Sequence, residues 1–151
     1  MYEPRQNAES DRASQPRVLI VEPNRGYLSL LARRVSQAGY RVTTADSAGT
    51  AIAELTRLPI ALVLAELRMP KVSGAELTAM IRDESAWRDV PVMLITGRSE
   101  PTAAVRAYEA GADDVILKPF HFEVLFARIE RRIARTRALQ KLRAGKAALD
   151  A

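Results

Sequence analysis

Five short apolar segments, each separated from the next by a stretch with helical periodicity, restrict the folds open to this chain. The segments are residues 17–21, 40–45, 60–67, 90–96 and 115–117. Several are apolar runs rich in β-branched residues, which is typical of strands buried on both faces of a parallel sheet. When such strands alternate with helices, right-handed crossovers place helices on both sides of the sheet. The sequence therefore predicts an α/β fold, a doubly wound, five-stranded parallel sheet flanked by five helices.

The predicted helices have recognisable ends, and the last one is extended. Apolar residues recur every three or four positions from residue 25 to 38, and Gly39 follows as a stop signal. The last helix begins near residue 120, and strong helix formers continue beyond residue 135. We therefore divide the chain into a flexible leader, a folded domain and a basic helical extension, which are residues 1–16, 17–135 and 136–151.

The composition removes several classes of function. The chain has no cysteine and a single histidine, His121, so it has no disulfide, no thiol nucleophile and no site built from several histidines. Its longest apolar runs are far shorter than the roughly 20 residues of a membrane-spanning helix. Its first 17 residues are polar and lack the apolar core of a secretory signal. We expect a cytoplasmic protein that spans no membrane.

The positive charge of the chain is concentrated at its carboxyl end. The net charge is +5, yet the first 120 residues hold equal numbers of basic and acidic side chains. Residues 121–151 hold eight basic side chains against three acidic ones. Such an asymmetry indicates an anionic partner for this segment, although a solvated helix surface explains it equally well.

Four polar side chains stand where the predicted strands end: Glu22, Glu66, Thr96 and Lys118. Functional groups of an open parallel sheet gather at the carboxyl ends of its strands. Two carboxylates, a hydroxyl and an ammonium group at such positions are suited to phosphate and metal chemistry. Each residue alone is a common strand terminus, but together they predict a functional site.

Four stretches of the sequence resemble the receiver domain of two-component response regulators, the CheY-like family. They read VLIVE at 18–22, LAELRMP at 64–70, PVMLITG at 91–97 and GADDVILKPF at 111–120. The resemblance extends over residues 17–135. It implies the CheY-like, flavodoxin-like topology and a cis peptide bond between Lys118 and Pro119. It also implies phosphoryl transfer from a histidine kinase to an aspartate at the end of the third strand, helped by a magnesium ion.

The chain departs from the family pattern at the residues that carry this chemistry. The phosphoacceptor position is Glu66 instead of an aspartate, and the acidic pair after the first strand is reduced to Glu22 followed by Pro23. Thr96 and Lys118 keep the hydroxyl and lysine positions. The resemblance therefore leaves a pocket that we interpret as vestigial.

These departures weigh against phosphorylation. The extra methylene of Glu66 moves its carboxylate by about 1.5 Å, and a misplacement of that size costs about a hundredfold in rate. Without a carboxylate at Pro23, we do not expect a magnesium site. The switch of the family pairs a hydroxyl with an aromatic ring, and here those two positions are Thr96 and Val115. We expect a degenerate receiver, or pseudo-receiver, without enzymatic turnover, cofactor or metal.

Two interpretations of Glu66 are left open. Its longer side chain places a carboxylate near Lys118 and Thr96, which would imitate the phosphorylated state. Alternatively, Glu66 pairs with Lys118 because a half-buried charge needs a partner. In both cases phosphorylation no longer controls signalling by the domain. The alternative is that Glu66 is phosphorylated in the conventional way.

The last predicted helix carries arginines that we assign to anion or partner binding: Arg128, Arg131, Arg132, Arg135 and Arg137. Arginine binds carboxylates and phosphates through paired hydrogen bonds and stacks on flat bases. The first candidate is a protein partner: a kinase, a chemotaxis component or a flagellar-motor component. The second is cyclic di-GMP, which some CheY-like regulators bind through a similar arginine-rich stretch. Nucleic acid ranks last, and a homodimer is left open.

We therefore predict a stand-alone signalling protein that acts by protein–protein interaction. The expected contact surface comprises residues 102–108 of the fourth predicted helix, Val115 of the fifth strand and the arginines of the last helix. Cyclic di-GMP binding through those arginines and phosphorylation of Glu66 are the alternatives.

Overall fold

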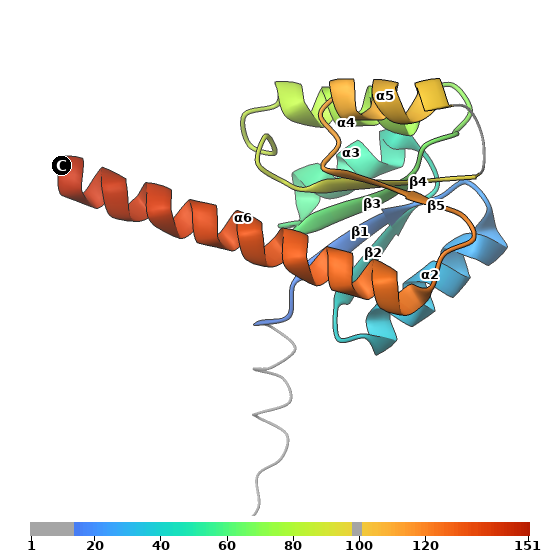
Figure 1. Ribbon diagram of the computed structural model, residues 1–151, viewed down its shortest axis with the longest axis horizontal. Coiled ribbons are helices and arrows are strands. Elements are labelled where there is room, and N and C mark those ends of the chain that lie inside the picture. Colours follow the sequence, from blue (N-terminus) through green and yellow to red (C-terminus); the bar gives the residue numbers. More distant parts are fainter. Residues whose placement is uncertain (1–13, 98–100) are drawn as a thin grey trace, which may run out of the picture.

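Five parallel strands form one sheet in the computed structural model, which describes residues 14–97 and 101–151 (Figure 1). Their order in the sheet is β2-β1-β3-β4-β5. The predicted doubly wound sheet of CheY-like topology is confirmed. The strands are β1 (Arg17–Val21), β2 (Arg41–Ala45), β3 (Leu62–Glu66), β4 (Val92–Thr96) and β5 (Asp114–Leu117).

Helices cover both faces of this sheet, and the last helix is extended as expected. α2 and α6 lie on one face, whereas α3, α4 and α5 lie on the other (Figure 1). Among the described residues, no helix is both long and apolar enough to cross a membrane. The helices of this part of the chain are α2 (Arg25–Gln37), α3 (Ala48–Arg57), α4 (Gly74–Asp83), α5 (Pro101–Glu109) and α6 (Phe122–Asp150).

The sheet has a hydrophobic core on each face because side chains alternate along a strand. In β1, Leu19 and Val21 pack into the core beneath α3, α4 and α5. Val18 and Ile20 pack into the core beneath α2 and α6. These four side chains are fully buried. A strand that is buried on both faces reads as a continuous apolar run, which is why the central strands were visible in the sequence.

Parallel pairing brings the ends of the strands to one edge of the sheet. Val21 of β1 lies opposite Ala65 of β3, and Glu66 lies opposite Ile95 of β4. Beyond β5, the backbone N–H of Lys118 donates to the carbonyl oxygen of the last residue of β4 at 2.8 Å. The side chains that follow these strands therefore share the carboxyl edge.

Local sequence signals define several element ends. The side chains of Asn24 and Ser73 cap α2 and α4 by accepting hydrogen bonds from backbone N–H groups of the first turn. Gly39 has a φ of 103°, a left-handed conformation that closes the turn after α2. The peptide bond between Lys118 and Pro119 is cis, as the resemblance implied.

The predicted start of the folded domain at residue 17 coincides with the start of β1, whereas no described element ends at residue 135. Gln15 and Pro16 are held in the fold, because Arg41 donates from Nε to Gln15 O at 3.1 Å and from its backbone to Pro16 O at 3.0 Å. Residues 1–13 of the expected leader lie outside the described residues. At the other end, α6 runs unbroken from domain into extension, and every residue from Arg137 onward is exposed.

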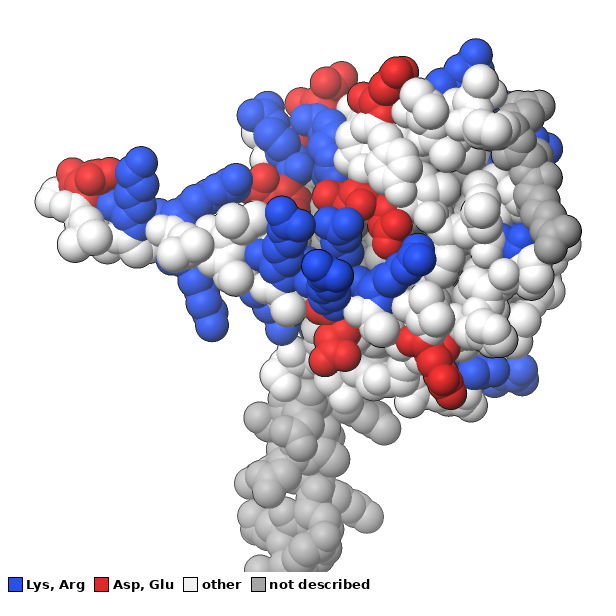
Figure 2. Space-filling view, in the orientation of Figure 1, with Lys and Arg blue, Asp and Glu red and all other residues white. Residues whose placement is uncertain are grey.

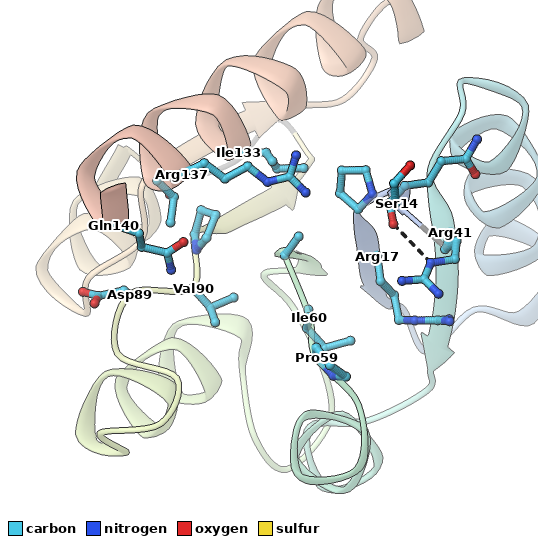
Figure 3. Close-up of a pocket in the computed structure, with 15 residues that line it drawn as sticks. Ser14, Arg17, Arg41, Pro59, Ile60, Asp89, Val90, Ile133, Arg137 and Gln140 are labelled. Carbon is cyan, nitrogen blue, oxygen red and sulfur yellow. Dashed lines mark hydrogen bonds between the residues drawn. The ribbon is translucent and has the colours of Figure 1, made fainter. Parts of the chain in front are cut away.

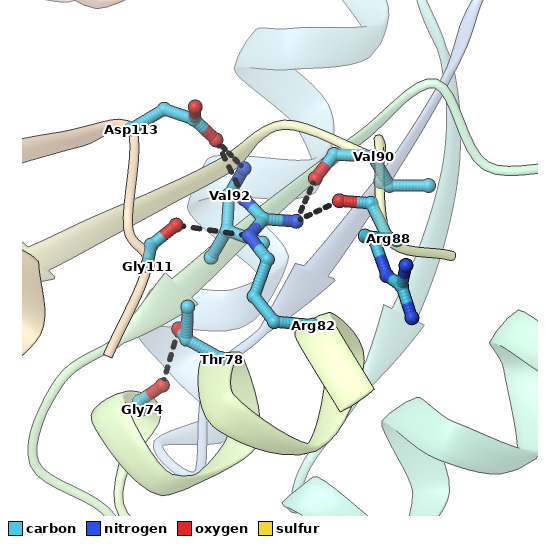
Figure 4. Close-up of polar contacts among 8 residues, drawn as sticks. All are labelled: Gly74, Thr78, Arg82, Arg88, Val90, Val92, Gly111 and Asp113. Atoms are coloured by element: carbon cyan, nitrogen blue, oxygen red, sulfur yellow. Dashed lines mark hydrogen bonds and ion pairs between the residues drawn. The ribbon is translucent and has the colours of Figure 1, made fainter. Parts of the chain in front are cut away.

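One arginine ties α4 to the segments that precede β4 and β5 (Figure 4). Arg82 donates from Nε to Gly111 O at 3.0 Å and pairs with Asp113 Oδ2 at 2.8 Å. A terminal nitrogen of Arg82 also donates to the carbonyl oxygens of Arg88, at 3.0 Å, and Val90, at 2.7 Å. The same Asp113 oxygen accepts the first backbone N–H of β4 at 2.8 Å. A single side chain thus links three elements.

Candidate functional site

Four polar side chains meet at the carboxyl edge of the sheet, where the sequence placed them. Glu22 follows β1, Glu66 ends β3, Thr96 ends β4 and Lys118 follows β5. The first three are buried, with 6, 8 and 1% of their surface exposed, and Lys118 is half-buried. Charges at such depth are poorly screened by water, so they act strongly on one another.

Glu66 is held on both sides of its carboxylate. Lys118 Nζ lies 2.7 Å from Glu66 Oε2, and Glu66 Oε1 accepts the backbone N–H of Arg68 at 3.2 Å. The Lys118 ammonium also lies 4.5 Å from the ring centre of Tyr27 in a cation–π contact. Both oxygens at the phosphoacceptor position are therefore engaged within the chain itself.

The loop that follows Glu66 depends on a close approach of Gly74. The backbone N–H of Gly74 donates to Leu67 O at 2.8 Å. A Cβ atom at this position would lie 2.5 Å from the carbonyl oxygen of Glu66 and 2.9 Å from the Cα of Leu67. Both neighbours are backbone, which cannot yield as a flexible side chain can. Gly74 therefore fixes where the end of β3, and with it Glu66, lies relative to α4.

The pocket disfavours the charged form of one of its carboxyl groups. Burial raises the pKa of Glu22 above its ordinary value, and the charge of Glu66 raises it further. Lys118 and the backbone N–H of Asn24 offset only part of this rise in pKa. Glu22 Oε2 is also buried without a hydrogen-bond partner among the described residues. Glu22 thus differs from Glu66 in forming no ion pair with a described residue.

Lys118 keeps its charge despite partial burial. Burial lowers the pKa of Lys118, but the hydrogen bond and charge of Glu66, together with Tyr27 and Glu22, outweigh it, so the pKa is raised. Tyr27 is shifted as well: burial raises the pKa of its hydroxyl, and Lys118 opposes this rise. Tyr27 was missed in the sequence, where a tyrosine in the first turn of a helix carries no signal.

The two positions of the family's switch do not form a hydroxyl–aromatic pair. Thr96 Oγ1 is buried and has no hydrogen-bond partner within residues 14–97 and 101–151. Val115 packs against the core beneath α3, α4 and α5. Its backbone N–H donates to the hydroxyl of Tyr108 on α5 at 3.2 Å. The hydroxyl of Tyr108 thus binds the backbone of β5.

The donor set at the carboxyl edge does not suit the magnesium ion that the family uses. Mg²⁺ needs oxygen ligands in near-octahedral geometry, including carboxylates. Glu22 and Glu66 are the carboxylates present, Pro23 offers no ligand atom, and Glu66 is paired with Lys118. Within the described residues, no three acidic, histidine or cysteine side chains gather closely enough to hold a metal.

The five arginines assigned from the sequence do not converge on one site. Arg128 lies 3.5 Å from an aspartate of β5. Arg132 and Arg135 line a groove farther along α6, whereas Arg137 lines a cavity on another side of the helix. Arg131 is exposed and lines neither of these two hollows.

The groove beside α6, which we call the arginine groove, measures about 270 Å³. Two aspartates line the groove, and each forms an ion pair: Asp113 with Arg82 at 2.8 Å and Asp89 with Arg143 at 2.6 Å. Figure 2 shows basic side chains gathered along α6. Arg132 and Arg135 form no ion pair with any described residue. The arginines that line the groove are Arg82, Arg88, Arg132, Arg135 and Arg143.

Sequence reasoning found two of these five arginines. Arg143 was detectable, because it lies eight positions after Arg135, with Leu139 midway, and so continues the same helix face. Arg82 and Arg88 carried no signal, since they belong to a segment about 50 residues away in the chain. Only the packing of α4 and its following loop beside α6 brings them to the groove.

A second hollow, of about 300 Å³, opens at the opposite edge of the sheet, where the strands begin (Figure 3). Arg17, Arg41 and Arg137 line it together with Asp89 and Gln140. Arg17 donates to a threonine hydroxyl of β2 at 2.9 Å, and Arg41 donates to a backbone oxygen just before β1 at 3.1 Å. Two of the three arginines are therefore bound within the fold, and this hollow is separate from the carboxyl edge.

Residues 18–130 match the model of the response regulator receiver domain. The chain is 35% identical over 114 residues to the sensory transduction protein BceR of Halalkalibacterium halodurans, covering 76% of this chain and 48% of that protein. It is 36% identical over 122 residues to the response regulator MprA of Mycobacterium leprae, covering 80% and 52%. The chain thus spans about half the length of the curated relatives it matches.

Solved structures agree with this assignment. The receiver domain of a histidine kinase from Syntrophus aciditrophicus has a TM-score of 0.74 at 28% identity, covering 79% of this chain and 90% of that one. The chemotaxis protein CheY4 of Vibrio cholerae shares the fold, with a TM-score of 0.74 at 24% identity and 78% and 98% coverage. With this sheet order and a match over most of its length, the chain belongs to the response regulator receiver domain family of two-component signalling.

Proposed function

We propose that this receiver signals by binding a protein partner and does not undergo normal aspartyl phosphorylation. The ion pair between Lys118 Nζ and Glu66 Oε2, at 2.7 Å, supports this proposal most directly. The pair exists in the unmodified chain, so the lysine position is already satisfied by a negative group. A permanent carboxylate thus takes the place of a transient phosphoryl group.

The surroundings of Glu66 support the same conclusion. The receiver of the kinase PA1611 from Pseudomonas aeruginosa, at 26% identity and a TM-score of 0.74 over 80% of this chain and 99% of that one, is described with a magnesium ion in its active-site cleft. In the present chain, Pro23 supplies no ligand beside Glu22. Phosphoryl transfer depends on positioning and charge neutralisation, and both are weakened here.

The partner surface that we propose lies on α5, β5 and the start of α6. Large apolar side chains from these three elements are about half exposed: Val105, Tyr108, Leu117 and Val124 at 54, 50, 55 and 44%. Grouped apolar residues on a surface mark interaction sites. The partner would be a kinase, a chemotaxis component or a flagellar-motor component in the cytoplasm, and a homodimer through this surface is the alternative.

Acetyl phosphate tests the phosphorylation half of the proposal. The chain is incubated with acetyl phosphate and magnesium, and its intact mass is measured. We expect no change for the unmodified chain and a gain of one phosphoryl group for the variant Glu66→Asp with Pro23→Asp, which restores both carboxylate positions. A gain on the unmodified chain that Glu66→Gln abolishes would contradict the proposal and favour conventional phosphorylation.

Cyclic di-GMP is the second candidate, because Arg132 and Arg135 share the arginine groove and form no ion pair with a described residue. Free guanidinium groups bind phosphates and stack on bases. Calorimetric titration of the unmodified chain and of the variant Arg132→Ala with Arg135→Ala tests this function. Heat from the first and not from the second would support it. Absence of heat from the unmodified chain, or equal heat from both, would remove it.

Nucleic acid remains the candidate that we rank last. Some relatives are named for DNA binding, such as the master transcriptional regulator RpaA of Synechocystis, at 29% identity over 121 residues. The match covers 80% of this chain and 50% of that protein. DNA binding is therefore a property of the whole relative, and nothing in the shared region transfers it to this chain.

A further inference from the structure

The second half of α6 extends beyond the sheet and is held to the domain at its surface by the ion pair between Arg143 and Asp89, at 2.6 Å. From Arg137 to Asp150 every residue is helical and exposed, and Figure 1 shows this part of α6 extending beyond the sheet. At about 1.5 Å per residue it is about 21 Å long. It continues a helix whose first half is already packed on the sheet, so it needs no separate nucleation. The exposed side chains along this half of α6 indicate the kind of surface that it would contact.

Three leucines form one stripe along this half of α6. Leu139, Leu142 and Leu149 are 46, 69 and 87% exposed. Single exposed leucines are ordinary on protein surfaces. A coiled-coil seam has residues at alternating spacings of three and four positions. Positions 139, 142, 146 and 149 follow this spacing, with leucine at three of them and Lys146 at the fourth. A second helix is the surface that fits such a stripe.

Basic side chains lie among and beside the leucines of this stripe and join it to the arginine groove. At about 100° per residue, Arg135, Arg143 and Lys146 lie within roughly 40° of Leu139 around the helix. Leu139 itself lines the arginine groove beside Arg132 and Arg135. Arg135 and Lys146 lie between Leu142 and Leu139 around the helix. The groove and the stripe therefore form one continuous surface in which leucines and basic side chains are interspersed, and Figure 2 shows the basic side chains along α6.

We propose that this surface docks an acidic amphipathic helix of another protein. The leucines would cover the apolar face of that helix, and its carboxylates would bind Arg132 and Arg135, which have no ion pair with a described residue. The inference goes beyond the proposed function, because it does not depend on whether Glu66 is phosphorylated. It adds a second contact surface, on the side of α6 near α4.

Charge decides against the other occupants. Residues 137–150 carry four basic side chains and one acidic side chain, so a second copy of the chain would bring like charges together. A nucleic acid would neutralise the arginines but leave the leucine stripe in water. An acidic amphipathic helix satisfies both parts of the surface.

A designed peptide tests the proposal with the full chain. The probe is a labelled synthetic helix of three heptads with leucine at positions a and d and glutamate at e and g, where the glutamates also keep the peptide from pairing with itself. Binding is followed by fluorescence anisotropy. We expect binding that weakens about fivefold or more, about 1 kcal/mol, for Lys146→Glu and for Leu142→Ser.

Lys141→Glu is the matched control. Lys141 and Lys146 are both exposed on α6 and change the net charge equally when replaced by glutamate, but they lie roughly 140° apart around the helix. Lys141→Glu should change the affinity less than twofold. Absence of binding, or equal losses for the two lysine variants, would overturn the proposal.

Two further measurements would also overturn it. A duplex DNA of 20 base pairs that binds more tightly than the peptide, with no effect of Leu142→Ser, would identify a polyanion surface. Sedimentation velocity that shows a dimer of the chain dissolved by Leu142→Ser would identify self-association. Neither result bears on the acetyl phosphate experiment, so the two proposals fail independently.

Discussion

Glu22 and Glu66 lie in the same buried pocket, yet their environments differ. Glu66 has Lys118 at 2.7 Å and the backbone N–H of Arg68, whereas Glu22 has one buried oxygen without a hydrogen-bond partner among the described residues. A buried charge without a close partner is costly. The charged form of Glu22 is therefore disfavoured in the fold, in agreement with the raised pKa of this residue.

Glu22→Gln should stabilise the fold at neutral pH. Because burial and Glu66 raise the pKa of Glu22, the folded chain keeps a proton that the unfolded chain loses above the ordinary value of 4.5. Stability contributed by Glu22 therefore falls as pH rises through this range. The variant should melt at a higher temperature than the unmodified chain at pH 7, and the difference should vanish below pH 4.5. Glu123→Gln, at an exposed position, should not raise the melting temperature and serves as the control. A lower melting temperature for Glu22→Gln than for the unmodified chain at pH 7 would contradict the prediction.

Gly74→Ala should destabilise the fold because a Cβ would meet the Glu66 carbonyl oxygen at 2.5 Å. We expect a loss of about 2 kcal/mol or more in the free energy of unfolding, measured in urea. Gly49→Ala is the matched control, since Gly49 lies in α3 and a Cβ there approaches nothing closer than 3.9 Å. That variant should be stabilised by about 0.5–1 kcal/mol. Equal effects of the two substitutions would show that the close approach is unimportant.

At the scale of elements, α4 and α6 are attached to the sheet in different ways. α4 is anchored by apolar residues and by Arg82, which donates to two loops and pairs with Asp113. α6 is attached by apolar residues of its first half, ending at Ile133. Polar anchoring fixes the position of α4 and its following loop, and that loop carries Arg88 to the arginine groove.

Arg82→Ala should loosen α4, β4 and β5 together. It removes the donors to Gly111, Arg88 and Val90 and leaves Asp113 with its β4 partner alone. We expect a loss of about 2 kcal/mol in the free energy of unfolding, since the side chains are partly exposed and their charges partly screened.

Arg57→Ala serves as the control for this prediction. Arg57 pairs with Glu54 at 2.6 Å on the surface of α3, so its loss should cost less than about 0.5 kcal/mol. If Arg82→Ala proves no more harmful than Arg57→Ala, the assigned role of Arg82 as an anchor is wrong.

At the scale of the whole molecule, the folding unit and the proposed docking surface overlap little. The last buried residue is Ile133, and all residues from Arg137 onward are exposed. The carboxyl edge, with Glu66 and Lys118, is built from strand ends, whereas the leucine stripe lies on the second half of α6. Substitutions at the carboxyl edge and substitutions in the second half of α6 should therefore act independently.

Removal of residues 137–151 should leave the fold intact. The deleted residues bury little surface, and the pair between Arg143 and Asp89 is exposed. We expect the free energy of unfolding to change by less than about 1 kcal/mol. Leu125→Ala, in the core beneath α6, should cost about 2–5 kcal/mol by contrast. If the shortened chain is unfolded, residues 137–151 are needed for folding and the prediction is wrong.

Much of this molecule follows from patterns that are local in the sequence. The buried strands were visible because runs such as 18–21 are apolar on both faces. The end of α2 was visible because Gly39 acts within one turn, whereas the Asn24 cap at its start was recognised only in the structure. The arrangement of Glu22, Glu66, Thr96 and Lys118 followed once the strands were taken as parallel, since parallel strands end at a common edge.

The amino-acid sequence by itself therefore determined the order of elements, a doubly wound parallel sheet and the side chains at its carboxyl edge, while the CheY-like topology was implied by the family resemblance. The tertiary structure decided which arginines share a groove and that Arg82 is a structural anchor. The physical reason is that periodicity assigns a residue to a face of its own helix or strand. The distance between side chains from remote segments depends on how those elements pack, and no local pattern records it.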